Sequence, residues 1–127
     1  MHIQLTLLLL LAMVSTPAPQ CKANLPLAGP CFVVHGRMRA YNGNPTFRIW
    51  RIGTDRLLGV TGAQPGEDPI MPDNLGCDFD HDVYADFEVC PFTAERPGVM
   101  QRVCVVSAEK RVIVQRTEDK VTAGEKR

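Results

Sequence analysis

The sequence predicts an all-β protein, either a small antiparallel β-sandwich or a partly open barrel of about six strands, preceded by a signal peptide. Short apolar runs alternate with polar residues at the period of two that is typical of strands. Turn-forming residues separate these runs, as at Asn42-Gly43-Asn44-Pro45. No helix candidate longer than the N-terminal apolar run is present. At 127 residues, the chain is expected to form one domain with a modest core.

The N-terminus is typical of an export signal. Residues 5–14 form an apolar run of ten residues interrupted by one threonine. This run is shorter than the roughly 20 residues of a membrane-spanning helix and fits the roughly 7 to 15 residues of a signal core. Cleavage after Ala23 satisfies the rule of small residues before the cut. Cys21 stands at a lipoprotein-like position, and it is therefore a candidate lipidation site as well.

These features predict the organisation and location of the chain. We expect a signal peptide over residues 1–23, a single β domain over 24–116 and a flexible polar tail over 117–127. The protein is expected to be exported, and to be periplasmic, associated with the cell envelope or secreted. Any attachment to a membrane would come from the signal or from a lipid anchor.

The predicted strands follow the alternation of apolar and polar residues. In chain order they cover residues 32–41, 46–52, 57–60, 83–91, 99–107 and 111–116. The first two form a hairpin around the Asn42–Pro45 turn. The fourth and fifth form a second hairpin around Pro97, and a turn at Ala108-Glu109-Lys110 separates the last two. Residues 61–82 are rich in proline and glycine and form a long connection.

The cysteine count predicts two disulfides. The chain has five cysteines, an odd number that is unusual in an oxidising compartment. Lipidation or removal of Cys21 would leave four. A hairpin around Pro97 places Cys90 opposite Cys104, which predicts the pair Cys90–Cys104 and leaves Cys31–Cys77 as the second pair. The alternatives are free buried cysteines or a metal site, and no cysteine or histidine spacing supports zinc.

Charge is balanced overall but not along the chain. Because 14 basic and 14 acidic residues cancel, the sequence does not indicate nucleic-acid binding. Residues 31–60 contain five arginines and one aspartate, a net charge of +4. Residues 61–92 contain eight acidic residues and no lysine or arginine, a net charge of −8. We therefore expect the acidic segment to lie against the arginine-rich hairpin.

The hairpin also provides a candidate binding surface. Its polar face would present side chains that are enriched where proteins meet partners or anionic groups, namely Arg37, Arg39, Tyr41, Arg48 and Trp50. The partner would be an unknown protein or an anionic ligand. The alternatives are an ordinary solvated sheet surface or pairing with the chain's own acidic loop. On this interpretation the protein is a binding or structural protein of the cell envelope or extracellular space and not an enzyme.

The alternative function is centred on the acidic loop, residues 73–86. Asp78, Asp80 and Asp82 alternate and could converge on calcium, which prefers several oxygen ligands. Such a site would make the chain a small secreted cation-dependent protein or hydrolase. His81 lies among these aspartates, but no nucleophile stands at a recognisable spacing, so no catalytic residue is assigned. Apart from calcium, no cofactor is expected.

Overall fold

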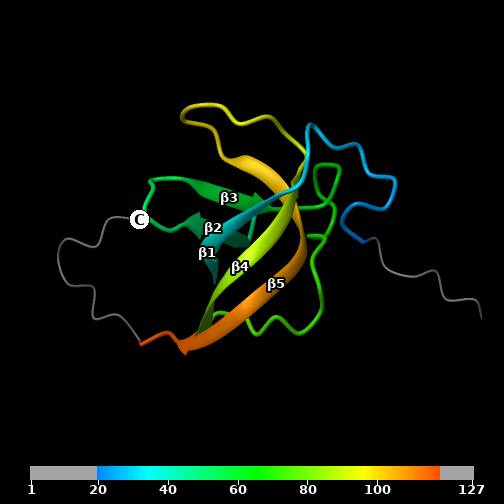
Figure 1. The fold of residues 1–127 in the computed structure, drawn as a ribbon. Coiled ribbons are helices and arrows are strands. Elements are labelled where there is room, and N and C mark those ends of the chain that lie inside the picture. Colours follow the sequence, from blue (N-terminus) through cyan, green and yellow to red (C-terminus); the bar gives the residue numbers. More distant parts are fainter. Residues whose placement is uncertain (1–19, 118–127) are drawn as a thin grey trace, which may run out of the picture.

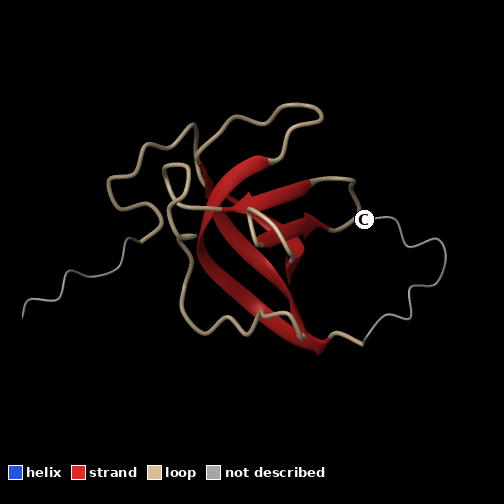
Figure 2. Cartoon of the chain, turned by 180° about the vertical axis from the view of Figure 1, so that it is seen from behind, coloured by secondary structure: helices blue, strands red, loops and turns tan. Residues whose placement is uncertain are grey.

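The computed structural model describes residues 20–117, which form five strands and no helix (Figure 1). The strands are β1 (Phe32–Ala40), β2 (Phe47–Arg51), β3 (Leu57–Val60), β4 (His81–Pro91) and β5 (Gln101–Gln115). Loops of varied length join them (Figure 2). Over the described residues, nothing forms a helix able to span a membrane. The all-β prediction is confirmed. The sheet has five strands where about six were expected, and it is mixed, so the expectation of a purely antiparallel sheet is wrong. The signal core and most of the predicted tail lie outside the described residues.

The strands form one mixed sheet in the order β1-β2-β3-β5-β4, and β4 pairs with β1 to close it into a barrel. The spatial order β4-β1-β2-β3 is a Greek key, in which three consecutive strands are followed by a fourth that returns beside the first. The pairs β1–β2, β2–β3, β1–β4 and β4–β5 are antiparallel, whereas β3 and β5 are parallel. Every strand therefore has two neighbours.

The main core lies inside the barrel and consists of the alternate, apolar positions of the strands. Its members include Val34, Met38, Ile49, Leu58, Val60, Val83, Phe87, Val89, Val103 and Val105. Gly36 lies on the same face, where a Cβ would come within 2.5 Å of Ile49 Cγ2 and 2.9 Å of the Trp50 carbonyl oxygen. The close approach of β1 and β2 therefore requires glycine at this position. The alternation that predicts the strands also defines this core.

The last two predicted strands are one continuous strand, β5, which pairs with β4 over most of its length (Figure 1). The predicted turn at Ala108-Glu109-Lys110 is wrong. Two register shifts accommodate the extra residues, and Lys110 takes a positive φ of 54° within one of them. A bulge with one residue in the left-handed region thus takes the place of the turn, because β4 is long enough to pair on both sides of it.

A second, smaller core lies where the segment before β1 covers the outer face of β4 and β5. Ile70, Cys90 and Cys104 are buried there, and Leu25, Leu27 and Phe92 pack against them. The main-chain N–H of Ala28 donates to the carbonyl oxygen of Pro91 at 2.8 Å. The N-terminal segment is therefore part of the folded domain.

Candidate binding surface

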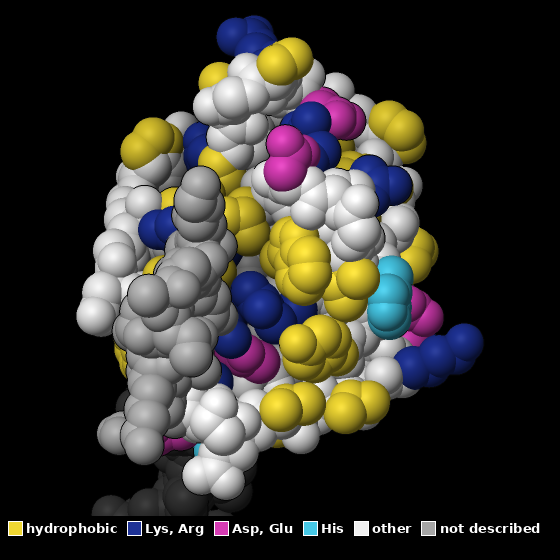
Figure 3. All heavy atoms as spheres, turned by 90° about the vertical axis from the view of Figure 1, so that its left-hand side faces the viewer, with side chains coloured by type: hydrophobic (Ala, Val, Ile, Leu, Met, Phe, Trp, Pro, Cys, Tyr) yellow, Lys and Arg dark blue, Asp and Glu magenta, His cyan; other side chains and the backbone are white. Residues whose placement is uncertain are grey.

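One row of residues crosses the outer face of all five strands. Leu57 pairs with Trp50, Trp50 with Arg37, Arg37 with Tyr84, and Tyr84 with Val112. Directly opposed residues on one face lie close enough for their side chains to interact. We name these five residues the aromatic–arginine strip. Figure 3 shows the face of the molecule on the side where Figure 1 draws β2 and β3, with hydrophobic and Lys/Arg side chains next to one another.

Arg37 is the central residue of the strip. Its guanidinium carbon lies 5.0 Å from the centroid of the Trp50 ring, in a cation–π contact. Its Nε is buried and has no hydrogen-bond partner among residues 20–117. Trp50 is itself fixed, because its Nε1 donates to the Thr54 carbonyl oxygen at 2.7 Å. The result is a positively charged group oriented by an aromatic ring, with a hydrogen-bond donor still unpaired.

Tyr41 and Arg48 form a second pair beside the strip. The Arg48 guanidinium carbon lies 4.7 Å from the centroid of the Tyr41 ring, and its Nε donates to the Pro45 carbonyl oxygen at 2.9 Å. The turn folds back over β3, where a Cβ on Gly59 would lie 2.7 Å from Pro45 Cγ. Arg48 therefore has a structural role in fixing this turn, and it still contributes positive charge to the same face.

Arg39 is not part of an exposed surface. Its Nε donates to both carboxylate oxygens of Asp82, at 3.1 and 3.0 Å, and its second terminal nitrogen donates to Oδ2 at 2.6 Å. Both side chains are close to fully buried, at 11% and 6% exposure. Arg116 Nε lies 3.7 Å from the same carboxylate. This bridge is a contact between the arginine-rich hairpin and the acidic segment.

The structure does not bring the three aspartates of the acidic loop together. Asp82 points to Arg39, whereas Asp78 is exposed and accepts hydrogen bonds from the Asp80 main-chain N–H at 2.8 Å and the His81 ring at 2.9 Å. These bonds lower the pKa of the Asp78 carboxyl, with the His81 contribution the largest. Over residues 20–117, no group of three carboxylates has donor atoms close enough to hold a cation.

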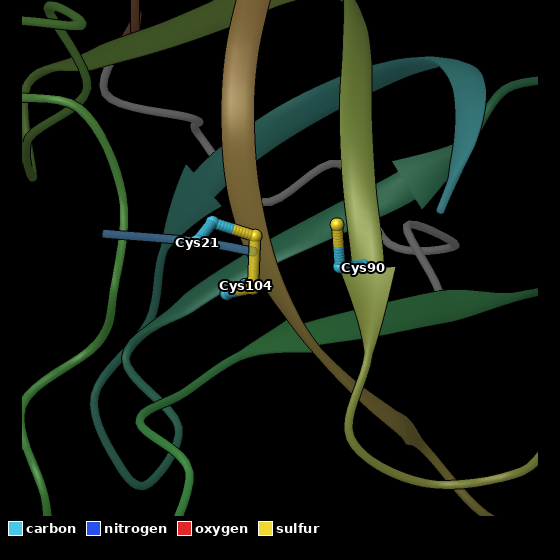
Figure 4. Close-up of side chains that lie close together, drawn as sticks. All are labelled: Cys21, Cys90 and Cys104. Carbon is cyan, nitrogen blue, oxygen red and sulfur yellow. A yellow bond between two sulfur atoms is a disulfide. The ribbon is translucent and has the colours of Figure 1, made fainter. Parts of the chain in front are cut away.

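Both predicted disulfide pairings differ from those in the structure, which joins Cys21 to Cys104 and Cys31 to Cys90. The predicted register is correct, since Cys90 lies directly opposite Cys104. Both side chains point to the outer face, where the N-terminal segment supplies their partners. Figure 4 shows the Cys21–Cys104 bond beside Cys90, and the three sulfur atoms lie within 4.8 Å of one another. A bonded Cys21 sulfur is incompatible with lipidation of that sulfur and with removal of Cys21.

Cys77 is the free cysteine of the described residues and is half-buried. Burial, followed by the charges of Asp82 and Asp78, raises the pKa of its thiol from 9.0 to about 12.

The thiolate is the reactive form of cysteine, and the thiolate population of Cys77 at pH 8 is expected to be about a thousandfold lower in the native protein than in the unfolded chain. We predict slow alkylation of Cys77 by iodoacetamide in the native protein and fast alkylation in urea, as followed by mass spectrometry. Equal alkylation rates in the native and urea-unfolded protein would contradict the half-buried position of the Cys77 thiol.

Searches of protein-family models, of curated proteins and of solved structures find no match to this chain. The interpretation of the surface therefore depends on its own geometry. The sequence predicts a binding surface of Arg37, Arg39, Tyr41, Arg48 and Trp50, and the structure places Arg37 beside Trp50 and Arg48 beside Tyr41 on the β1–β2 hairpin. The sequence did not indicate that Tyr84 belongs to this surface, although Tyr84 lies between core residues on β4 as the alternation predicts. Its position opposite Arg37 depends on the β1–β4 pairing, which no local pattern indicates.

Proposed function

We propose that the protein is an exported, disulfide-stabilised binding domain that takes an anionic group of its partner on the aromatic–arginine strip. The observation that carries this proposal is the Arg37 guanidinium, which is stacked on Trp50 and has a buried Nε without a hydrogen-bond partner among the described residues. A carboxylate, sulfate or phosphate oxygen would accept hydrogen bonds from the terminal nitrogens of this guanidinium, because the Nε itself is buried and out of reach of an external anion. Charge-assisted hydrogen bonds of this kind are stronger than neutral ones.

The distribution of charge supports an external anion at this position. Asp82 is engaged by Arg39 and Arg116, and Asp86 on the neighbouring strand lies 2.9 Å from His35. No ion pair joins Arg37 or Arg48 to a carboxylate of residues 20–117. The acidic segment thus neutralises Arg39 and leaves Arg37 and Arg48 without a carboxylate partner among the described residues.

Export is proposed on the sequence of the N-terminus together with the two disulfides. Disulfides persist in oxidising compartments and are rare in the cytosol. Both bridges bind the N-terminal segment to the barrel, at Cys21–Cys104 and Cys31–Cys90. A signal peptide in this chain would have to be cleaved before Cys21. The competing function, a cation-dependent protein centred on residues 73–86, has weaker support because Asp78 and Asp82 have other partners and no three carboxylates of the described residues converge.

The proposal predicts that Arg37→Ala weakens binding to a flexible polyanion by about ten- to a hundredfold, because a charge-assisted hydrogen bond contributes about 1.5 to 3 kcal/mol. Trp50 is the single tryptophan of the chain and provides the signal. Oxidised full-length protein would be titrated with dextran sulfate while Trp50 fluorescence is recorded, with uncharged dextran as the control polymer.

The matched control is Arg51→Ala. This substitution also removes one arginine charge, at the residue that follows Trp50 on β2. Arg51 is exposed and points to the other side of the strand. We expect the control variant to bind nearly as tightly as the wild type. Equal loss in both variants would indicate a general charge effect, and an unchanged affinity in Arg37→Ala would contradict the proposal.

A further inference from the structure

We infer that the two disulfides form a redox switch, in which reduction of the Cys21–Cys104 bridge by an external dithiol moves the remaining bridge from Cys31–Cys90 to Cys90–Cys104. This exchange would release the N-terminal segment, residues 20–31, from the outer face of β4 and β5. The barrel itself would stay cross-linked. The inference does not depend on the proposed binding of an anion.

Sulfur atoms from the two bridges lie next to one another on this outer face. The Sγ atoms of Cys21, Cys90 and Cys104 all lie within 4.8 Å of one another, and Cys90 belongs to the other bridge (Figure 4). A thiolate released from one bridge is therefore already beside a disulfide sulfur of the other. Exchange between thiols and disulfides proceeds by attack of a thiolate on such a sulfur.

The β4–β5 pairing allows the bridge that the exchange would form. Cys90 and Cys104 are directly opposed in this antiparallel pair. Opposed residues have Cα atoms about 4.5 or 5.5 Å apart, and both distances fall within the range of about 4.4 to 6.8 Å that disulfides span. A Cys90–Cys104 bridge therefore requires rotation of two side chains and no change of register.

Each existing bridge has one accessible end and one buried end. Cys21 and Cys31, which precede β1, are half-buried, whereas Cys90 and Cys104 have no exposed surface. A reductant that attacks Cys21 releases the Cys104 thiolate next to Cys90. Attack on Cys31 would release the Cys90 thiolate next to Cys104. Both routes lead to the same cross-strand bridge.

The exchange consumes one dithiol and conserves electrons. The first thiolate of the dithiol attacks Cys21 Sγ, and the Cys104 thiolate leaves. The Cys104 thiolate attacks Cys90 Sγ and displaces the Cys31 thiolate, which takes a proton from water. The second thiol of the reductant then displaces Cys21 from the mixed disulfide. The dithiol ends as a disulfide, and the protein ends with Cys90–Cys104 and with thiols at Cys21 and Cys31.

The contacts that would still hold the N-terminal segment are non-covalent. Leu25 and Leu27 pack against the smaller core, and the Ala28 N–H donates to the Pro91 carbonyl oxygen at 2.8 Å. The ion pair of Lys22 with Glu88 is partly exposed, and such pairs contribute little. Loss of both covalent links would therefore let this segment separate from the barrel.

The test is limited reduction of the oxidised full-length protein without denaturant. One equivalent of dithiothreitol is added, and free thiols are blocked with N-ethylmaleimide. Digestion with trypsin and glutamyl endopeptidase places each of the five cysteines on a separate peptide, so mass spectrometry can assign every bridge. We expect the main species with one bridge to contain Cys90–Cys104, with maleimide on Cys21 and Cys31.

The control protein is Cys77→Ser, which lacks the free thiol of the described residues and should give the same product. The inference is overturned if the main one-bridge species keeps Cys21–Cys104 or Cys31–Cys90, or if both bridges are lost without a cross-strand product. It is also overturned if the product disappears in Cys77→Ser, because the attacking thiol would then be Cys77.

Release of the segment has a separate measurement, which is amide hydrogen exchange followed by nuclear magnetic resonance. The Ala28 N–H is expected to exchange at least about tenfold faster after the treatment, because its hydrogen bond to Pro91 would open. The matched control is the Thr61 N–H, which donates to the Val103 carbonyl oxygen at 3.0 Å and should be unaffected. Unchanged exchange at Ala28 in the protein with the Cys90–Cys104 bridge would contradict release of the segment.

Discussion

Removal of the Cys21–Cys104 bridge by the double substitution Cys21→Ser and Cys104→Ser is expected to lower the free energy of unfolding by about 3 to 4 kcal/mol. The bridge joins residues separated by 83 positions, but the Cys31–Cys90 bridge that remains shortens the loop it closes to about 25 residues, and closing this loop still restricts the unfolded chain. Small domains have a total stability of about 5 to 15 kcal/mol, so this loss is large. Urea unfolding of the oxidised protein and the double variant measures it directly.

Both cysteines are replaced because a lone Cys104 thiol would lie close to the Cys90 sulfur and could exchange with the second bridge. The control is Cys77→Ser, which changes a cysteine that forms no bridge. It is expected to change stability much less. A double variant as stable as the wild type would contradict the structure. So would a peptide map of the wild-type protein in which Cys90 is linked to Cys104.

The substitution Asp82→Ala is expected to destabilise the domain by about 3 to 5 kcal/mol. It removes the carboxylate that accepts three hydrogen bonds from Arg39 and leaves that arginine without its compensating charge at a buried position. The cost comes mainly from the buried charge that remains, more than from the lost attraction. Thermal unfolding followed by circular dichroism, together with urea titration, would measure the change.

The paired replacement Arg39→Met with Asp82→Leu is expected to recover most of this loss, since it removes both charges and keeps apolar volume. The matched control is Asp80→Ala, which removes an exposed carboxylate two residues before Asp82 and should change stability by less than about 0.5 kcal/mol. If Asp82→Ala and Asp80→Ala had equal effects, the bridge between Arg39 and Asp82 would not be a stabilising feature of the fold.

The local parts of the fold are predictable from the sequence. The Asn42–Pro45 turn is formed, with the Tyr41 N–H donating to the Thr46 carbonyl oxygen at 2.8 Å, because these residues accept turn geometry at low cost. The strand at residues 57–60 has the bounds that its apolar pattern indicates. In each of these elements, the determining contacts lie within a few residues of one another along the chain.

The elements that depend on distant contacts could not be predicted in the same way. The parallel β3–β5 pair and the β1–β4 pair connect segments far apart in the sequence. The disulfide partners of Cys90 and Cys104 lie on a segment without strand structure, so no strand pattern indicates them. The charged residues Glu109 and Lys110 are typical of a turn, but pairing with β4 continues beyond them and a bulge forms instead.

The candidate site shows the same division. Arg37 lies opposite Trp50 in the β1–β2 hairpin. This contact depends on one local hairpin, so the sequence of that hairpin can indicate it. The burial of Arg39 follows from Asp82 on β4, a strand that lies 43 residues further along the chain. The expectation that the acidic segment neutralises the hairpin is therefore correct for Arg39 and not for Arg37. This difference determines which arginine is available to a partner.

The most direct test of the central proposal is the nuclear magnetic resonance signal of the Arg37 Nε–H group in ¹⁵N-labelled, oxidised protein. Addition of dextran sulfate is predicted to shift this signal, because an anion bound by the terminal nitrogens of the guanidinium changes the electronic environment of the buried Nε–H, which has no hydrogen-bond partner within the described residues. The Arg102 Nε–H, which donates to Thr61 Oγ1 at 3.3 Å, should remain unchanged. An Arg37 signal that does not move at saturating polyanion, or one that moves no more than the Arg102 signal, would contradict the proposal.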